Sequence, residues 1–161
     1  MAHQLSLLTK RFSCPALVYC RAQKLGALYV EAVQRHLEAK KRHSVHSEGW
    51  AKATAYAFDV LRLEECDEVA KPEWWNDEGL KALSARVLCA APNNVGANLM
   101  RAQVLGGKSS AWEPGPRSAA ELKEAAAHYD RSAALCDTPA AKASFSRIAE
   151  SCRSQAEAMS M

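Results

Sequence analysis

The chain has 161 residues, 48% of them apolar, which suits one domain with a core of its own. Alanine supplies much of the apolar share, and no alternating apolar-polar run predicts a strand, so we expect an all-α protein. No apolar stretch reaches the roughly 18 residues of a membrane helix, so we expect a soluble protein without a membrane partner.

The net charge of +3 conceals two segments of opposite sign. Residues 1–47 carry eight Lys and Arg against two acidic residues, whereas residues 59–78 carry eight acidic residues against two basic ones. The basic run at residues 40–43 could attract an acidic partner or nucleic acid. It equally suits a solvated helix end, where cations complement the C-terminal dipole, and we favour that interpretation.

Breaking and capping signals predict seven helices in chain order. Pro15 opens the first and Gly26 ends it, and a capping box at Ser118 and Glu121 opens the sixth. The helices are expected at about 15–25, 26–42, 47–61, 77–88, 95–105, 118–136 and from 139 onward. We therefore expect three helix pairs followed by a C-terminal capping helix, in a domain spanning residues 14–161. Residues 1–13 are expected to form a flexible N-terminal segment.

Two short segments of the chain recur. The hexapeptide RAQKLG at residues 21–26 returns as RAQVLG at 101–106, and residues 85–92 have an echo at 132–139, each ending in proline. Internal repetition in a helical chain predicts an array of similar units stacked on one another. The offsets of the two echoes differ, so extra residues must lie in the loops.

The second helices of the first and third predicted pairs carry a pattern of small, aromatic and small residues, whereas the fourth helix has Glu78 and Ala82 at the small and aromatic positions. Ala125, Tyr129 and Ser132 follow it, and Ala32, His36 and Ala39 follow it with histidine in the aromatic position. In these residues the chain resembles the tetratricopeptide repeat (TPR) family, whose unit is a helix pair of 34 residues. The resemblance implies an α-solenoid of about three TPR-like pairs, with the first helices lining a concave groove.

This resemblance implies a non-catalytic scaffold that binds a peptide or a partner helix in its groove. The partner is expected to be another protein, and its identity and the oligomeric state of the chain are left open. Aligning the ends of the first helices gives a partner-binding groove in which small and neutral residues predominate. Its candidate residues are Gln23, Lys24, Ala55, Phe58, Met100 and Gln103. The alternative is a helical-repeat module for single-stranded RNA, which the acidic middle of the chain disfavours.

Three tryptophans lie in predicted loops or next to helix starts, namely Trp74, Trp75 and Trp112. Exposed tryptophans often anchor a partner, so these residues are possible loop anchors. They can also fold back over the helices and plug the stack, and we favour the plug.

The sequence offers no catalytic or metal-binding constellation. The six cysteines form no CxxC pair, and no Ser/His/Asp or Cys/His grouping is localised enough for nucleophilic catalysis. We therefore expect no enzyme activity, no cofactor and no metal. We expect a cytoplasmic protein; the absence of acids from the first thirty residues leaves mitochondrial import of a short leader as the weaker alternative.

Overall fold

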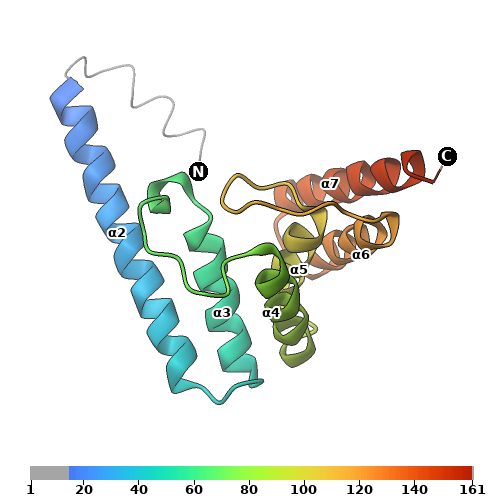
Figure 1. The fold of residues 1–161 in the computed structure, drawn as a ribbon, viewed down its shortest axis with the longest axis horizontal. Helices are drawn as coiled ribbons and strands as arrows, with labels where there is room; N and C mark the ends of the chain where they lie inside the picture. The colour runs from blue at the N-terminus through green and yellow to red at the C-terminus, as the bar shows by residue number, and fades with distance from the viewer. Residues whose placement is uncertain (1–14, 161) are drawn as a thin grey trace.

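The computed structural model describes the backbone of residues 15–160 and the side chains of residues 27–64 and 66–160. The predicted flexible segment at residues 1–13 lies outside these residues. Over the described part the chain is all-α, with six α-helices and one short 3-10 helix (Figure 1). These are α2 (Pro15–Arg42), α3 (Glu48–Leu61), η2 (Glu64–Cys66), α4 (Asp77–Ala90), α5 (Val95–Gly106), α6 (Ala119–Leu135) and α7 (Pro139–Ala158).

Each α-helix packs against the next one in the chain, and α3 also packs against α5. In Figure 1 the pair α2 and α3 occupies one end of the molecule and the pair α6 and α7 the other, with α4 and α5 between them. Sequential packing of this kind is the arrangement of a small helical array. Across residues 15–160, no helix is both long enough and apolar enough to cross a membrane.

The predicted helix break at Gly26 is wrong, because α2 runs without interruption from Pro15 to Arg42. A glycine in a helix interior destabilises it by about 1 kcal/mol, which does not end a helix whose flanking residues favour it. Leu25 and Ala27 are strong helix formers. Six helices therefore stand where seven were expected, and residues 15–42 form one long helix in place of the first predicted pair.

The predicted helix starts are confirmed at several caps. The side chain of Ser47 accepts a hydrogen bond from the backbone N–H of Trp50, and Ser118 and Glu121 form the reciprocal capping box. Asn94 caps α5 in the same way, through the backbone N–H of Ala97. These caps fix where α3, α5 and α6 begin.

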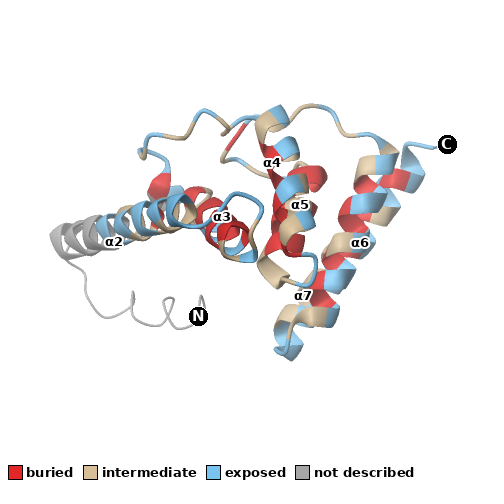
Figure 2. Ribbon diagram, turned by 90° about the horizontal axis from the view of Figure 1, so that it is seen from below, coloured by how far each residue is buried: buried red, intermediate tan, exposed pale blue. Residues whose placement is uncertain are grey.

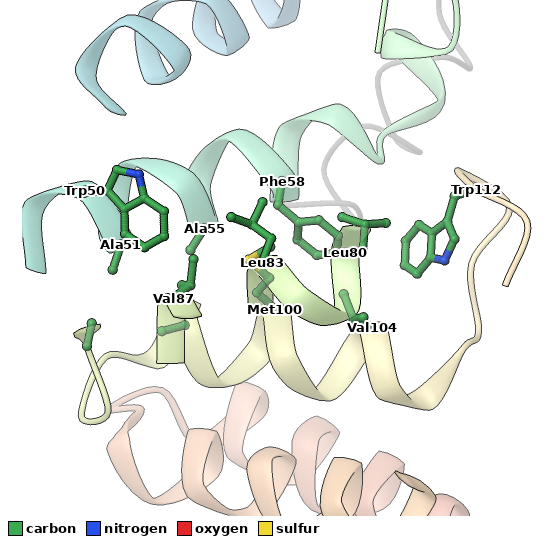
Figure 3. Close-up of a cluster of buried hydrophobic side chains, with 12 residues drawn as sticks. Trp50, Ala51, Ala55, Phe58, Leu80, Leu83, Val87, Met100, Val104 and Trp112 are labelled. Carbon is green, nitrogen blue, oxygen red and sulfur yellow. The ribbon is translucent and has the colours of Figure 1, made fainter. Parts of the chain in front are cut away.

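The main apolar core lies between α3, α4 and α5. Figure 3 shows Trp50, Ala55 and Phe58 of α3 facing side chains from α4 and α5, with Trp112 from the following loop at one end of the row. Alanines make this core thin on the α3 side, where Ala51 and Ala55 contribute to it. Small side chains let helices approach closely, and α3 lies between α2 on one side and α4 and α5 on the other (Figure 2).

Candidate functional site

The helix α3 exposes a single strip to solvent. Its exposed residues are Glu48, Lys52, Tyr56 and Asp59, at spacings of four, four and three. This is the periodicity of one helix face, and the remaining residues of α3 are buried or half-buried. An otherwise enclosed helix therefore presents one narrow polar strip.

The strip borders a hollow of about 470 Å³ between α3 and α5. That volume lies within the range of small-ligand sites, about 300–1,000 Å³. The floor and inner wall of the hollow are apolar, and are made by Ala55, Phe58, Val95, Gly96, Leu99 and Met100. Its rim is polar, and is made by Lys52, Tyr56, Asp59, Asn93, Asn94 and Gln103.

Four of the residues predicted for the groove line this hollow together. Phe58 and Met100 are each only 1% exposed and Ala55 is 5% exposed, so these three form its floor. Gln103 is half-buried at the rim and is the predicted residue best placed to touch a ligand. The side chains of Gln23 and Lys24 lie outside the described part of the structure.

The amide of Gln103 forms no hydrogen bond with any residue whose side chain the structure describes. The neighbouring amides are more committed, since Asn94 caps α5 and the side-chain oxygen of Asn93 accepts from Arg131. A carboxamide combines an acceptor oxygen and a donor N–H₂, which match the N–H and C=O of a peptide group. Gln103 can therefore hold a polypeptide backbone across the hollow.

Tyr56 is the large exposed aromatic residue on the rim, with 60% of its surface accessible. Its ring stacks on His36 of α2, with 5.2 Å between ring centroids. On either side of Tyr56 the strip is charged, with Lys52 paired to Glu48 and Asp59 paired to Arg62 within the helix or just beyond it. The rim is thus an aromatic platform between a cation and an anion.

The alignment of helix ends missed Lys52, Tyr56 and Asp59 because it selected only the positions that are equivalent between the first helices. The signal that could have found them is the polar periodicity itself, since these residues interrupt an alanine-rich helix at helical spacing. Their position beside α5 depends on the contact between α3 and α5, which sequence spacing does not reveal.

The three predicted loop tryptophans pack together around Phe58 of α3, at the edge of the main apolar core. Trp75 and Trp112 both contact the ring of Phe58, at centroid distances of 5.6 and 5.8 Å, and Trp74 contacts Trp75. The indole N–H of Trp75 donates to the backbone oxygen of Ala111, which ties two loops together. Trp112 is 7% exposed, and Trp74 and Trp75 are half-buried.

The tryptophans also hold α2 in place. The ammonium of Lys40 lies 4.8 Å from the ring centroid of Trp74 and 5.9 Å from that of Trp50. Burial and then the charge of Arg86 lower the pKa of Lys40 from its ordinary value. This cation–π contact fixes the C-terminal end of α2, which carries His36 to the rim of the hollow.

A second hollow of about 350 Å³ continues the first around the N-terminus of α5. The two share Lys52, Asn93 and Asn94, and Glu48 lines the second. We call the two hollows together the α3–α5 groove. All four exposed residues of α3 therefore border this groove.

Over the described residues, no three His, Cys, Asp or Glu side chains lie close enough to hold a metal ion. Comparison of the chain with models of protein families, with curated proteins and with solved structures found no match.

Proposed function

We propose that the chain is a TPR-like interaction module that binds an extended peptide of another protein in the α3–α5 groove. The observation that carries this proposal is the groove itself, with its apolar floor, its polar rim and the free amide of Gln103. An apolar floor accepts a side chain, while rim amides satisfy the backbone of the bound segment. The proposal needs no catalytic group and no cofactor.

Two features support the TPR-like identity. The pattern residues Ala125, Tyr129 and Ser132 of α6 are all buried, and Ala125 and Tyr129 belong to the core shared by α5, α6 and α7. The contact between α3 and α5 also matches an array in which first helices stack along one face. The uninterrupted α2 departs from the family pattern, so the array we propose has two helix pairs, α3–α4 and α5–α6, flanked by α2 and α7.

An extended peptide suits the groove better than a helix does. A Cβ atom built on Gly96 of α5 would lie 3.5 Å from the Cβ atom of Ala55 of α3, so the two helices are close together here. A helix with its side chains is about 10–12 Å wide and would sit above such a floor without filling it. An extended segment can place alternate side chains into it.

The test uses a phage-displayed library of random short peptides selected on the purified chain. We expect the selected peptides to bind the wild type and to lose about tenfold or more in affinity to a Tyr56→Ala/Gln103→Ala variant, measured by fluorescence anisotropy. Both substitutions are at exposed or half-buried helical positions, so the fold should survive. The matched control is Gln34→Ala/Gln155→Ala, at exposed positions of α2 and α7.

Equal affinity of the Tyr56→Ala/Gln103→Ala variant and the control would contradict groove binding. The RNA alternative is tested beside it with a fluorescent single-stranded oligonucleotide. The exposed stack of Tyr56 and His36 favours that alternative, because bases stack on aromatic rings. The rim disfavours it, because it offers one cation, Lys52, against the carboxylate of Asp59. Salt-sensitive RNA binding that the double variant abolishes would put the RNA function first.

A further inference from the structure

We propose that the α3–α5 groove selects extended peptides in which an apolar residue lies between an acidic residue on one side and a basic residue on the other. This inference rests on the proposed function and adds the charge pattern of the partner. It is carried by the order of groups along the exposed strip of α3, where Lys52, Tyr56 and Asp59 follow one another beside the apolar floor.

The two charges of the strip are separated by a distance that an extended peptide can match. Lys52 and Asp59 are seven residues apart, and a helix rises 1.5 Å per residue, so they lie about 10 Å apart along the axis of α3. An extended peptide advances about 3.3 Å per residue. Side chains alternate between the two faces of an extended peptide, so residues two positions before and two positions after a central residue lie on the same face as that residue. These two flanking residues are about 13 Å apart, which the flexible side chains of peptide and strip can match to the two charges.

The opposite wall of the larger hollow carries no charge. It is formed from the α4–α5 turn and α5, and its residues are Asn93, Asn94, Val95, Gly96, Leu99 and Gln103, with Met100 below. The charged residues that line this hollow therefore all come from α3, and the nearby Arg131 is held by the side-chain oxygen of Asn93. A ligand acid is attracted to the Lys52 end and a ligand base to the Asp59 end, whichever way the peptide chain runs.

Both charges already have partners on their own side of the groove, and these partners leave them available. Lys52 pairs with Glu48 at 2.6 Å and Asp59 pairs with Arg62 at 3.0 Å. All four side chains are at least 31% exposed, and exposed pairs of this kind contribute little to stability. An ammonium has three donors and a carboxylate several acceptor sites, so each can add a ligand contact without losing its neighbour.

The floor between the charges accepts the central apolar residue. Ala55 and Gly96 offer no bulk above it, and Phe58 and Met100 close it from below. The free amide of Gln103 faces the same hollow and can hold the peptide group beside the inserted side chain. The groove can therefore recognise three features of one short peptide segment: an acidic residue, an apolar residue and a basic residue.

The experiment uses four synthetic peptides of equal length, capped at both ends to remove terminal charge. Each has a central leucine, and the positions two residues before and two residues after it are acid and base, two acids, two bases, or two alanines. We expect the wild type to bind the acid-and-base peptide most tightly, by about two- to fivefold for each matched charge. Raising the salt concentration should reduce this preference.

Reversing one charge of the strip should change which peptide binds best. Lys52→Glu makes the rim anionic and should favour the peptide with two bases, whereas Asp59→Lys makes it cationic and should favour the peptide with two acids. The matched controls are Lys142→Glu and Asp137→Lys, which change the net charge equally at exposed positions away from the groove. These controls should keep the wild-type order, and circular dichroism of each variant checks its helix content.

The outcomes separate this inference from the proposed function. If all four peptides bind the wild type equally and Tyr56→Ala/Gln103→Ala abolishes binding, groove binding stands and the charge pattern is wrong. An unchanged order of affinities in Lys52→Glu and Asp59→Lys also overturns the charge pattern. If none of the four peptides binds, and the random library yields no groove-dependent ligand, the proposed function itself fails.

Discussion

Arg117 and Asp77, which are 40 residues apart in the chain, form a two-pronged ion pair that joins the loop before α6 to the first turn of α4. The Arg117 side chain is only 6% exposed, and its guanidinium also donates to the backbone oxygens of Val104 and Gly115. Paired geometry of this kind is the strong form of a charge-assisted hydrogen bond. A long loop that could have been mobile is therefore fixed to the helical array.

Replacing Arg117 with methionine should destabilise the fold by about 3 kcal/mol, because it leaves Asp77 without its main partner and two backbone oxygens without a donor. Urea unfolding followed by circular dichroism measures this change. The control is Arg35→Met, since Arg35 pairs with Glu31 on an exposed helix face and such a pair contributes less than about 1 kcal/mol. Equal losses for the two variants would contradict a structural role for the Arg117 pair.

Acidification should destabilise the fold through Asp77 and Glu121. The hydrogen bond from Arg117 lowers the pKa of Asp77 to about 2, and the hydrogen bond from Lys81 lowers the pKa of Glu121 to about 2. In the unfolded chain such groups titrate near about 4, so the stabilisation is complete above that pH. It is lost as the pH falls toward 2, because protonation then favours the unfolded state.

Lys81 provides the test of this pH dependence, because its ammonium contacts both Asp77 and Glu121, at 3.3 and 2.7 Å. We expect the urea midpoint of the wild type to fall steeply between about pH 4 and 2. In Lys81→Met the fall should be shallower, whereas in the exposed-site control Lys142→Met it should match the wild type. A parallel fall in Lys81→Met would show that other carboxylates dominate.

The adjacent glycines Gly106 and Gly107 should respond in opposite directions to alanine. Gly107 has a φ of 62°, and a Cβ atom there would lie 2.8 Å from Nε of Arg117. Gly107→Ala should therefore cost about 1–2 kcal/mol from the left-handed backbone alone. Gly106 is helical, and apart from its chain neighbours and its own helix backbone no atom lies within 4 Å of an added Cβ, so Gly106→Ala should stabilise by about 0.5–1 kcal/mol. Thermal unfolding of the two variants provides the comparison.

The buried side chain of Asn98 should control the titration of His128. Its amide donates to the backbone oxygens of Pro92 and Asn94, and its oxygen lies 3.1 Å from Nδ1 of His128. Burial is the main cause that lowers the pKa of His128 from the ordinary histidine value. In Asn98→Asp a carboxylate would face the ring, so the pKa of His128 should rise, as measured by NMR titration.

Asn98→Asp should also destabilise the fold by about 1–3 kcal/mol, because a carboxylate cannot donate to the backbone oxygens of Pro92 and Asn94. The control is Asn93→Asp, at an exposed position where the side-chain oxygen already accepts from Arg131. It should leave both the stability and the titration of His128 close to those of the wild type. No rise in the His128 pKa of Asn98→Asp would indicate that the two side chains do not interact in solution.

Local signals in the sequence predicted the helix starts well and the first helix end badly. Ser47 and the pair of Ser118 and Glu121 act within one turn, so neighbouring residues are enough to predict their caps. The repeated hexapeptide shows the opposite case, since it is helical in both copies and the chain leaves the helix only after the second. The residue after each copy makes the difference, because Gly107 adopts the left-handed cap whereas Ala27 continues the helix.

The groove was only partly predictable for a similar reason. Ala55, Phe58, Met100 and Gln103 could be placed from the resemblance between units, and all four line the hollow. The exposed strip was missed because its residues show no repeat between α3 and α5. The ties from Trp75 to Ala111 and from Arg117 to Asp77 span 36 and 40 residues, and no local pattern encodes a contact at that range.

The residues of α3 fall into two sets, a buried set that packs against other helices and the exposed strip that faces solvent. The buried alanines, Phe58 and Leu61 hold the helices together. Lys52, Tyr56 and Asp59 are exposed, and their side chains contact those of Glu48, His36 and Arg62 respectively. Substitutions at exposed positions of this kind generally change the free energy of unfolding by only about 0.5 kcal/mol. Under the proposed function, ligand preference could therefore change through these three positions while the fold stays intact, and randomising them would be a route to new binding specificities.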